Sequence, residues 1–211
     1  MRGASAAPEG GAPKPGAAGA SAMRETRAFT GVVLAGGLGR RMGAPKATAA
    51  LAGRPLVAYP LGALRAVCAR VVVVAKRDTE LPPDLERWDE PGEPRHPVVG
   101  IAHALERAGG PIVVCAADMP FVTPGVLGLL AGTLVPGLKA AAAFCEGRLE
   151  PLLAAYAPEA GEILAGAPAG EPLRRTVESL MPVLVDVTPD VVFNVNTPGD
   201  LAEAERRVRR G

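Results

Sequence analysis

The chain has 211 residues, which suits one α/β domain, and 48% of them are apolar, which is enough for a substantial core. Its 23 basic side chains nearly balance its 22 acidic ones, and the net charge of +1 argues against a general attraction for nucleic acid or an anionic membrane. Aromatic residues make up only 3%, so stacking platforms for bases are scarce.

The first 27 residues are rich in Ala, Gly and Pro. Such a segment cannot bury enough apolar surface to offset the entropy lost on ordering. We therefore predict that residues 1–27 form a disordered, low-complexity tail and that residues 28–211 form the folded domain.

Strands and helices alternate through the first half of this domain. Residues 31–34 are a β-branched run typical of a buried strand, and the four valines at 71–74 predict a second one. Between them, apolar periodicity up to Val67 predicts a helix with a late start or a kink at Pro60. Residues 81–97 carry five prolines and predict a loop with little regular structure.

The alternation continues in the second half. Residues 99–108 predict a helix and residues 112–116 a third buried strand. Thr123 before Pro124 is typical of an N-cap and a first helical residue, so a helix is expected from there to about Leu134.

The last third of the chain is less uniform. Residues 139–144 and 183–187 predict strands, and residues 149–156 fit either a strand or a short helix. Thr197 followed by Pro198 and Asp200 resembles a capping box, which predicts the start of a final helix.

This order of elements implies an α/β fold with a mostly parallel sheet, covered by helices on both faces, in a single domain. Ligands bind such sheets at the carboxyl ends of the strands. A site is therefore expected in the loops after Leu34, Val74 and Ala117.

Other classes of protein have little support. The three cysteines, Cys68, Cys115 and Cys145, are odd in number and lack CxxC spacing, which argues against a disulfide framework or a zinc site. No apolar stretch reaches the roughly 20 residues that span a bilayer, and the first 22 residues lack the apolar region of a signal peptide. A cytoplasmic protein is expected.

The first chemistry-bearing segment is the glycine-rich loop at residues 34–46, which follows a predicted strand. Four glycines let the backbone approach a ligand and present its amide N–H groups, and Arg41 and Lys46 add positive charge. The glycines are Gly36, Gly37, Gly39 and Gly43. The pattern is neither a Walker A loop nor a GxGxxG fingerprint. We interpret it as a loop that holds the phosphates of a nucleoside triphosphate; the alternative is a flexible connection with solvated arginines.

Two further segments fall at predicted strand ends or beside a helix. Asp118 follows the strand at 112–116, where a carboxylate can hold Mg²⁺ against phosphate oxygens, although an Asp can also simply end a strand at a proline turn. Asn194 and Asn196 alternate by two, so on a strand their amides share one face; the alternative is local capping of the final helix.

These motifs together resemble the MobA family, the molybdenum cofactor guanylyltransferases, over roughly residues 30–211. The resemblance rests on Leu-Ala-Gly-Gly at 34–37, Arg-Met-Gly at 41–43, Lys46, Asp-Met-Pro at 118–120 and Asn-Val-Asn-Thr-Pro at 194–198. It implies a Rossmann-like, doubly wound fold in which residues 28–211 are the nucleotidyltransferase domain. It also implies transfer of GMP from Mg-GTP to the terminal phosphate of molybdopterin, with release of pyrophosphate.

The resemblance also implies roles for single residues. Leu34, Ala35, Gly36, Gly37 and Asp89 are expected near the nucleotide, with Lys46 on its phosphates, Arg41 assisting catalysis and Asp118 binding Mg²⁺ as the cofactor. Asn194 and Asn196 are expected on the pterin side. Implied partners are GTP or another NTP, the molybdenum cofactor, and proteins of cofactor biosynthesis or molybdoenzyme maturation, with neither nucleic acid nor membrane.

Departures from the family pattern fall where the base is expected. Val74 stands where the family has a nucleotide-contacting Asn, Lys76 lies close by, and His96 replaces the first glycine of a Gly-Pro-Leu-x-Gly turn. Two other functions therefore stay open. One is a related transferase that uses CTP or another NTP on a phosphorylated acceptor, and the other is a non-catalytic nucleotide- or cofactor-binding protein.

Overall fold

The computed structural model describes residues 28–36 and 46–210, so the predicted tail at 1–27 lies outside them. Its centre is a seven-stranded sheet in the order β5-β4-β1-β6-β8-β7-β9. The strands are β1 (Thr30–Leu34), β4 (Arg70–Ala75), β5 (Arg87–Asp89), β6 (Ile112–Ala116), β7 (Ala140–Cys145), β8 (Arg148–Tyr156) and β9 (Val183–Asp186). Only β8 runs antiparallel to its neighbours among these strands, so the sheet is mostly parallel, as predicted.

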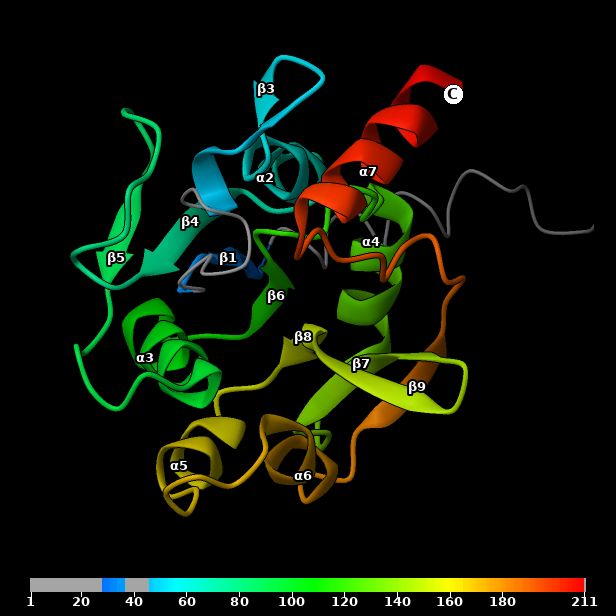
Figure 1. Cartoon of the computed structure of the whole chain (residues 1–211). Helices are drawn as coiled ribbons and strands as arrows, with labels where there is room; N and C mark the ends of the chain where they lie inside the picture. The colour runs from blue at the N-terminus through cyan, green and yellow to red at the C-terminus, as the bar shows by residue number, and fades with distance from the viewer. Residues whose placement is uncertain (1–27, 37–45, 211) are drawn as a thin grey trace, which may run out of the picture.

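Helices cover both faces of the sheet. They are η1 (Lys46–Thr48), α2 (Ala58–Arg65), α3 (Pro97–Ala108), α4 (Pro124–Thr133), α5 (Ala160–Ala165), α6 (Leu173–Glu178) and α7 (Pro198–Arg210). Figure 1 shows the sheet separating α3, α5 and α6 from α2 and α4. The predicted doubly wound α/β fold in one domain is confirmed.

Side-chain alternation along the central strands explains the two layers. On β1, Val33 packs in a cluster with α2 and α4, whereas Val32 packs in a second cluster with α3, α5 and α6. Successive residues of a strand point to opposite faces, so each strand contributes to both clusters. Because aromatics are few, the sheet packs largely through Val, Leu and Ala, and the four alanines at 140–143 are fully buried.

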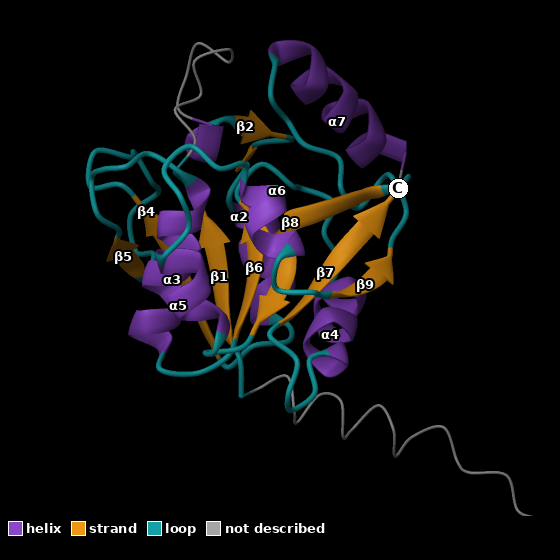
Figure 2. Cartoon of the chain, turned by 90° about the horizontal axis from the view of Figure 1, so that it is seen from below, coloured by secondary structure: helices purple, strands orange, loops and turns teal. Residues whose placement is uncertain are grey.

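A third, smaller cluster fixes the C-terminal helix. Leu51 and Leu56, from the hairpin of β2 (Ala50–Leu51) and β3 (Arg54–Pro55), pack with Val195 and Ala204. Figure 2 shows that α7 consequently lies beyond the carboxyl ends of β1 and β6, beside β2. The segment just before α7 is thereby brought to the edge of the sheet where a ligand is expected.

Several sequence predictions are confirmed at their stated positions. Pro60 is the third residue of α2, so the late helix start holds. The Thr123 hydroxyl accepts the N–H of Val126 and caps α4. Residues 149–156 form most of strand β8 rather than a helix.

Two predictions need correction. Residues 81–97 have little regular structure, as expected, but a three-residue strand, β5, lies within them and pairs in parallel with β4; burial of Trp88, only 3% exposed, anchors this strand. Asn194 and Asn196 do not lie on a strand, since residues 193–196 are an irregular segment leading into α7. In the part of the chain that is described, no helix is long and apolar enough to cross a membrane.

Candidate active site

A cavity of about 330 Å³ opens at the carboxyl ends of β1, β4 and β6. β1 lies between the other two, and its continuation is joined to both: Ala35 N–H donates to Val74 O at 2.9 Å, and Ala117 N–H donates to Leu34 O at 3.0 Å. The three predicted loops therefore meet at one cleft, the switch point at which α/β sheets bind ligands. Leu34, Ala35 and Gly36 all line it.

At one end of this cleft, three predicted residues meet although they are far apart in sequence. The Lys46 ammonium donates to Asp118 Oδ2 at 2.7 Å and to Asn196 Oδ1 at 2.5 Å. The side chains of Lys46 and Asp118 keep 17% and 18% of their surface exposed, so the pair is accessible to a ligand. We refer to Lys46, Asp118 and Asn196 as the phosphate-side cluster.

The start of α7 holds Asn196 in this cluster. Val195 is fully buried, and its N–H donates to Asp118 O at 2.9 Å. The N–H groups of Asn196 and Thr197 donate to Asp200 Oδ2, at 2.9 and 2.8 Å, and the Asp200 N–H donates back to Thr197 Oγ1 at 3.2 Å. These backbone hydrogen bonds, led by that of Asn196, hold the pKa of Asp200 below its ordinary value. The predicted capping box is present.

Asn194 behaves differently from Asn196. Its side-chain amide donates to Val192 O at 2.9 Å, a local contact within the irregular segment before α7. The strand-face argument for pairing the two amides therefore fails, and the structure brings only Asn196 to Lys46 and Asp118. Arg41 and Gly37, which were also predicted for the site, lie outside the described residues.

The other end of the cleft contains Lys76 and His96, which the sequence placed near the expected base, and Glu90, which sequence reasoning did not select. Glu90, Lys76 and His96 line the cavity, whereas Asp89, the predicted residue, lines a neighbouring one. The Asp89 carboxylate is paired with Arg87 at 2.6 Å and more loosely with Arg77 at 3.7 Å. Asp89 is the last residue of β5, and the acidic residue that lines the cleft is its neighbour Glu90. We call the two residues Glu90 and Lys76, at this end of the cleft, the base-side pair.

Glu90 is held tightly at this position. It is 8% exposed, and Oε2 has no hydrogen-bond partner among residues 28–36 and 46–210. Burial raises the pKa of its carboxyl group, against the opposing charge of Lys76. A Cβ at Gly36 would lie 3.0 Å from Oε1, and a Cβ at Gly100 would lie 2.8 Å from Oε2, so a side chain at Gly100 would displace the carboxylate and one at Gly36 would press on it.

His96 occupies the N-cap of α3. Its Nδ1 accepts the N–H of Val98 at 3.3 Å, which satisfies one of the free amides at the start of the helix. A chain position that the family resemblance assigns to glycine thus carries a side chain that caps the helix and lines the cleft.

The residues present fit one divalent cation held mainly by a ligand. In the described residues there is no group of three or more His, Cys, Asp or Glu side chains with metal-ligand geometry. Asp118 alone offers a partly exposed carboxylate in the cleft beside Lys46. Mg²⁺ is commonly bound through one or two carboxylates together with substrate phosphates and water, so a single Asp is sufficient.

Comparison with known proteins shows which family this chain is similar to. The family model of the MobA-like NTP transferase domain matches residues 31–184. The molybdenum cofactor guanylyltransferase of Rhodobacter capsulatus is 33% identical, over 86% of this chain and 97% of the relative. That of Xanthomonas euvesicatoria pv. vesicatoria is 35% identical, over 83% of this chain and 94% of the relative.

Solved structures give the same result for the fold. Molybdopterin-guanine dinucleotide biosynthesis protein A from Archaeoglobus fulgidus is 28% identical and superposes with a TM-score of 0.71, over 87% of this chain and all of that one. The 2-C-methyl-D-erythritol 4-phosphate cytidylyltransferase from Thermus thermophilus, at 24% identity and a TM-score of 0.64, covers 86% of this chain and 99% of that one. The second likeness shows a shared fold only.

Proposed function

We propose a specific reaction for this protein on the premise that the chain belongs to the MobA-like NTP transferase family and is therefore a nucleotidyltransferase of molybdenum cofactor biosynthesis. The reaction is transfer of GMP from Mg-GTP to the terminal phosphate of molybdopterin or its molybdenum-loaded form. The observation that carries the proposal is the phosphate-side cluster, in which Lys46 contacts both Asp118 and Asn196.

The chemistry needs no general base. A phosphate oxygen of the acceptor attacks the α-phosphorus of GTP in line, the new P–O bond forms, and the bond to the β-phosphate breaks to release pyrophosphate. A phosphate monoester already carries about −1.5 to −2 charges at neutral pH, so no side chain must remove a proton from it. Catalysis is then a matter of positioning and charge stabilisation, for which Lys, Asp and backbone N–H groups are suited.

Each residue of the cluster has a part in that reaction. The Lys46 ammonium exchanges its contact with Asp118 for phosphate oxygens of GTP. Asp118 and the phosphates would hold Mg²⁺, which supplies neutralisation of the charge on the phosphate oxygens when bound. Asn196 faces Lys46 from the α7 side, so the acceptor is proposed to enter between α7 and the cleft.

Glu90 supports guanine as the base. Its Oε2 is a buried acceptor with no donor in the described part of the chain, which is unfavourable unless a ligand supplies one. Guanine presents two adjacent donors, N1–H and the 2-amino group, on one edge. On cytosine and adenine the exocyclic amine stands next to an acceptor nitrogen instead. A carboxylate therefore favours guanine over either alternative.

Pyrophosphate release tests the proposal directly. The protein is incubated with Mg²⁺ and GTP, CTP, ATP or UTP, with and without molybdenum cofactor, and products are identified by mass spectrometry. We expect pyrophosphate and a guanine dinucleotide only with GTP plus acceptor. Equal or faster release with CTP would establish the cytidylyl alternative, and tight nucleotide binding without any release would establish a binding protein.

A further inference from the structure

Lys76 is a buried lysine whose hydrogen-bonding capacity is fully used inside the protein. Its residue is 3% exposed, and Nζ donates to Pro91 O and, at 3.3 Å, to Pro94 O, while Glu90 Oε1 lies 3.5 Å away. An ammonium has three N–H groups, and three acceptors surround this one. Lys76 therefore has no donor left for a nucleotide phosphate, although it lines the cleft.

The partner of Lys76 is the group that is incomplete. Glu90 Oε1 faces the ammonium, but within the described ranges Oε2 has no partner. Gly36 from the start of the phosphate loop and Gly100 from the first turns of α3 leave no space for the carboxylate to shift toward either backbone. Three elements thus fix one carboxylate with its second oxygen unsatisfied.

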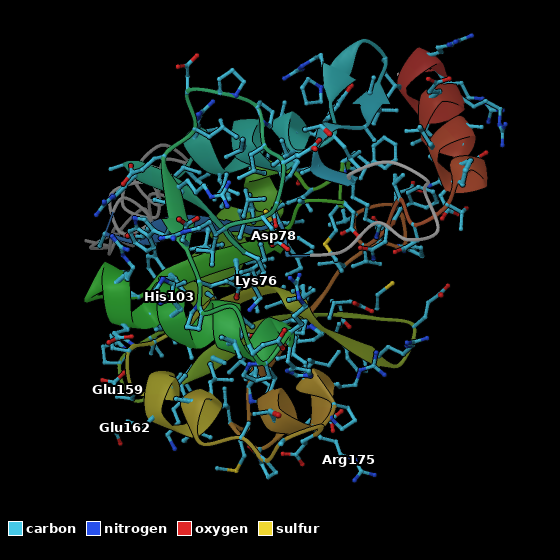
Figure 3. All side chains as sticks on the ribbon, turned by 60° about the vertical axis from the view of Figure 1, so that its left-hand side comes forward. Lys76, Asp78, His103, Glu159, Glu162 and Arg175 are labelled. Atoms are coloured by element: carbon cyan, nitrogen blue, oxygen red, sulfur yellow. The ribbon has the colours of Figure 1, made fainter. Side chains whose placement is uncertain are left out.

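Figure 3 shows where the lysine lies: near Asp78 and His103, with which it also lines the neighbouring cavity. The polar groups there are satisfied differently. Asp78 is paired with Arg95 at 2.7 Å, and Arg77, with a side chain 92% exposed, approaches Asp89. Lys76 and Arg95 each line both cavities, and among the described residues Lys76 is the one that forms an ion pair with Glu90.

We propose that Lys76 is a positioning residue for base selection, an inference that rests on the proposed function. Lys76 keeps the Glu90 carboxylate charged and oriented, so that Glu90 accepts two adjacent N–H groups of a guanine base. Without Lys76 this buried carboxyl group would have only the charge of Arg95 to compensate it, and poorly compensated buried carboxyl groups take up a proton instead of remaining charged. A protonated carboxyl presents a donor where the base needs an acceptor. Base preference would then be lost while the phosphate side stays intact.

The test compares GTP with ITP, whose base, hypoxanthine, lacks only the 2-amino group of guanine. Four proteins are compared: the wild type, Lys76→Met, Glu90→Gln and the double variant. For each protein, calorimetry gives the Kd of both nucleotides, and the transfer reaction with acceptor gives KM and kcat. We expect Lys76→Met to reduce the preference for GTP over ITP by about tenfold, as for loss of one hydrogen bond to a charged group, mainly through KM. Arg77→Met, which removes an exposed neighbouring cation, serves as the matched control and should change nothing.

The double variant separates positioning from direct contact. If Lys76 acts only through Glu90, Lys76→Met adds no further loss of GTP affinity in the Glu90→Gln background. Additive losses would overturn the proposal, since they would mean that Lys76 contacts the nucleotide itself. An unchanged ratio of GTP to ITP affinity in a folded Lys76→Met protein would also overturn it.

A pH series adds a readout that a merely structural role would not move. The charged groups facing Glu90 in the described structure are Lys76 from the end of β4 and Arg95 from the following loop, and His96 lines the same cleft. In Lys76→Met, affinity for GTP should recover relative to wild type as pH rises from about 6 to about 8.5 and the buried carboxyl ionises. His96 is present in both proteins and cancels in this comparison.

Failure of this inference is distinguishable from failure of the proposed function. Suppose that the wild type binds GTP and releases pyrophosphate, and that Lys76→Met keeps the same base preference. That result refutes only the role of Lys76. Wild-type protein that binds GTP no better than ITP refutes the role of Glu90 in base selection and this inference with it. Absence of pyrophosphate release while the calorimetric preferences follow the expected pattern refutes only the transfer reaction.

Discussion

Asp118→Asn provides the sharpest test of how the phosphate side works. Asp118 Oδ2 lies 2.7 Å from the Lys46 ammonium, so each charge neutralises the other. The proposed reaction requires both to change partners, Lys46 to the phosphates and Asp118 to Mg²⁺. Asparagine has the same shape but removes the negative charge, so it releases Lys46 and weakens the metal site in one step.

The two effects have opposite signs and different sizes. At an effective dielectric constant of about 20, charges at this distance attract by about 6 kcal/mol before desolvation and screening are subtracted. A pair that is partly open to solvent contributes about 1 kcal/mol net. Without metal, nucleotide affinity of Asp118→Asn should therefore rise by about fivefold, since Lys46 no longer has to leave a partner. With Mg²⁺, kcat should fall by at least about a hundredfold, as for removal of one key electrostatic group.

Calorimetry with GTP in the presence of a chelator gives the first quantity, and pyrophosphate release with Mg²⁺ and acceptor gives the second. Lys46→Met is the matched control, because it removes the other half of the pair and should weaken nucleotide binding under both conditions. Weaker metal-free binding by Asp118→Asn, or turnover within tenfold of wild type, would refute the proposed exchange of partners.

Two further substitutions test the supports of the site. Gly100→Ala places a Cβ 2.8 Å from Glu90 Oε2 and should weaken GTP binding about tenfold. The control is Gly62→Ala, in α2 with open space around it, which should only stabilise the helix by about 0.5–1 kcal/mol. Equal GTP affinity in the two variants would contradict this prediction. Asp200→Asn should lower the free energy of unfolding by about 0.5–1 kcal/mol. Because the pKa of Asp200 is lowered in the folded state, this contribution is present above the unfolded pKa of about 4 and disappears as pH falls through the folded value. Thermal unfolding between about pH 3 and pH 7 checks it, and a difference that stays constant down to pH 3 would rule out this origin.

Most of the fold could be predicted because its signals are local. Runs of valine, the Thr123–Pro124 cap and the box around Asp200 each reveal an element within a few residues. The misjudged segments depend on distant partners instead. β5 is short, and it becomes a strand because Trp88 packs under α3 and the strand pairs with β4. Helices α5 and α6, at six residues each, were not predicted, since so few residues show too little periodicity.

The residues of the site likewise differ in whether the sequence could predict them. Lys46, Asp118 and Asn196 could be selected from sequence because each belongs to a motif, and the fold brings them together across 72 and 150 residues. Glu90 could not be distinguished from Asp89 by sequence, because two adjacent acidic residues at a strand end alternate in direction. Which of them points inward is decided by the pairing of β5 with β4. Once β5 is known to be a strand with Trp88 buried, the alternation of side chains places Glu90 on the same side as Trp88 and Asp89 on the other.

The two ends of the cleft differ in how freely their charges can move, and this difference suggests an order of events. The phosphate-side cluster keeps about a fifth of its charged surface exposed and rests on contacts that a nucleotide can replace. The base-side pair is almost wholly buried and lies against two glycines, so it changes partners much less freely than the phosphate-side cluster. Recognition by a fixed acceptor discriminates between bases, because the wrong edge leaves buried groups unpaired. Phosphates, by contrast, are common to all four nucleotides. Base contacts should therefore govern which nucleotide binds, and the exchange of partners by Lys46 and Asp118 should govern how fast the bound one reacts.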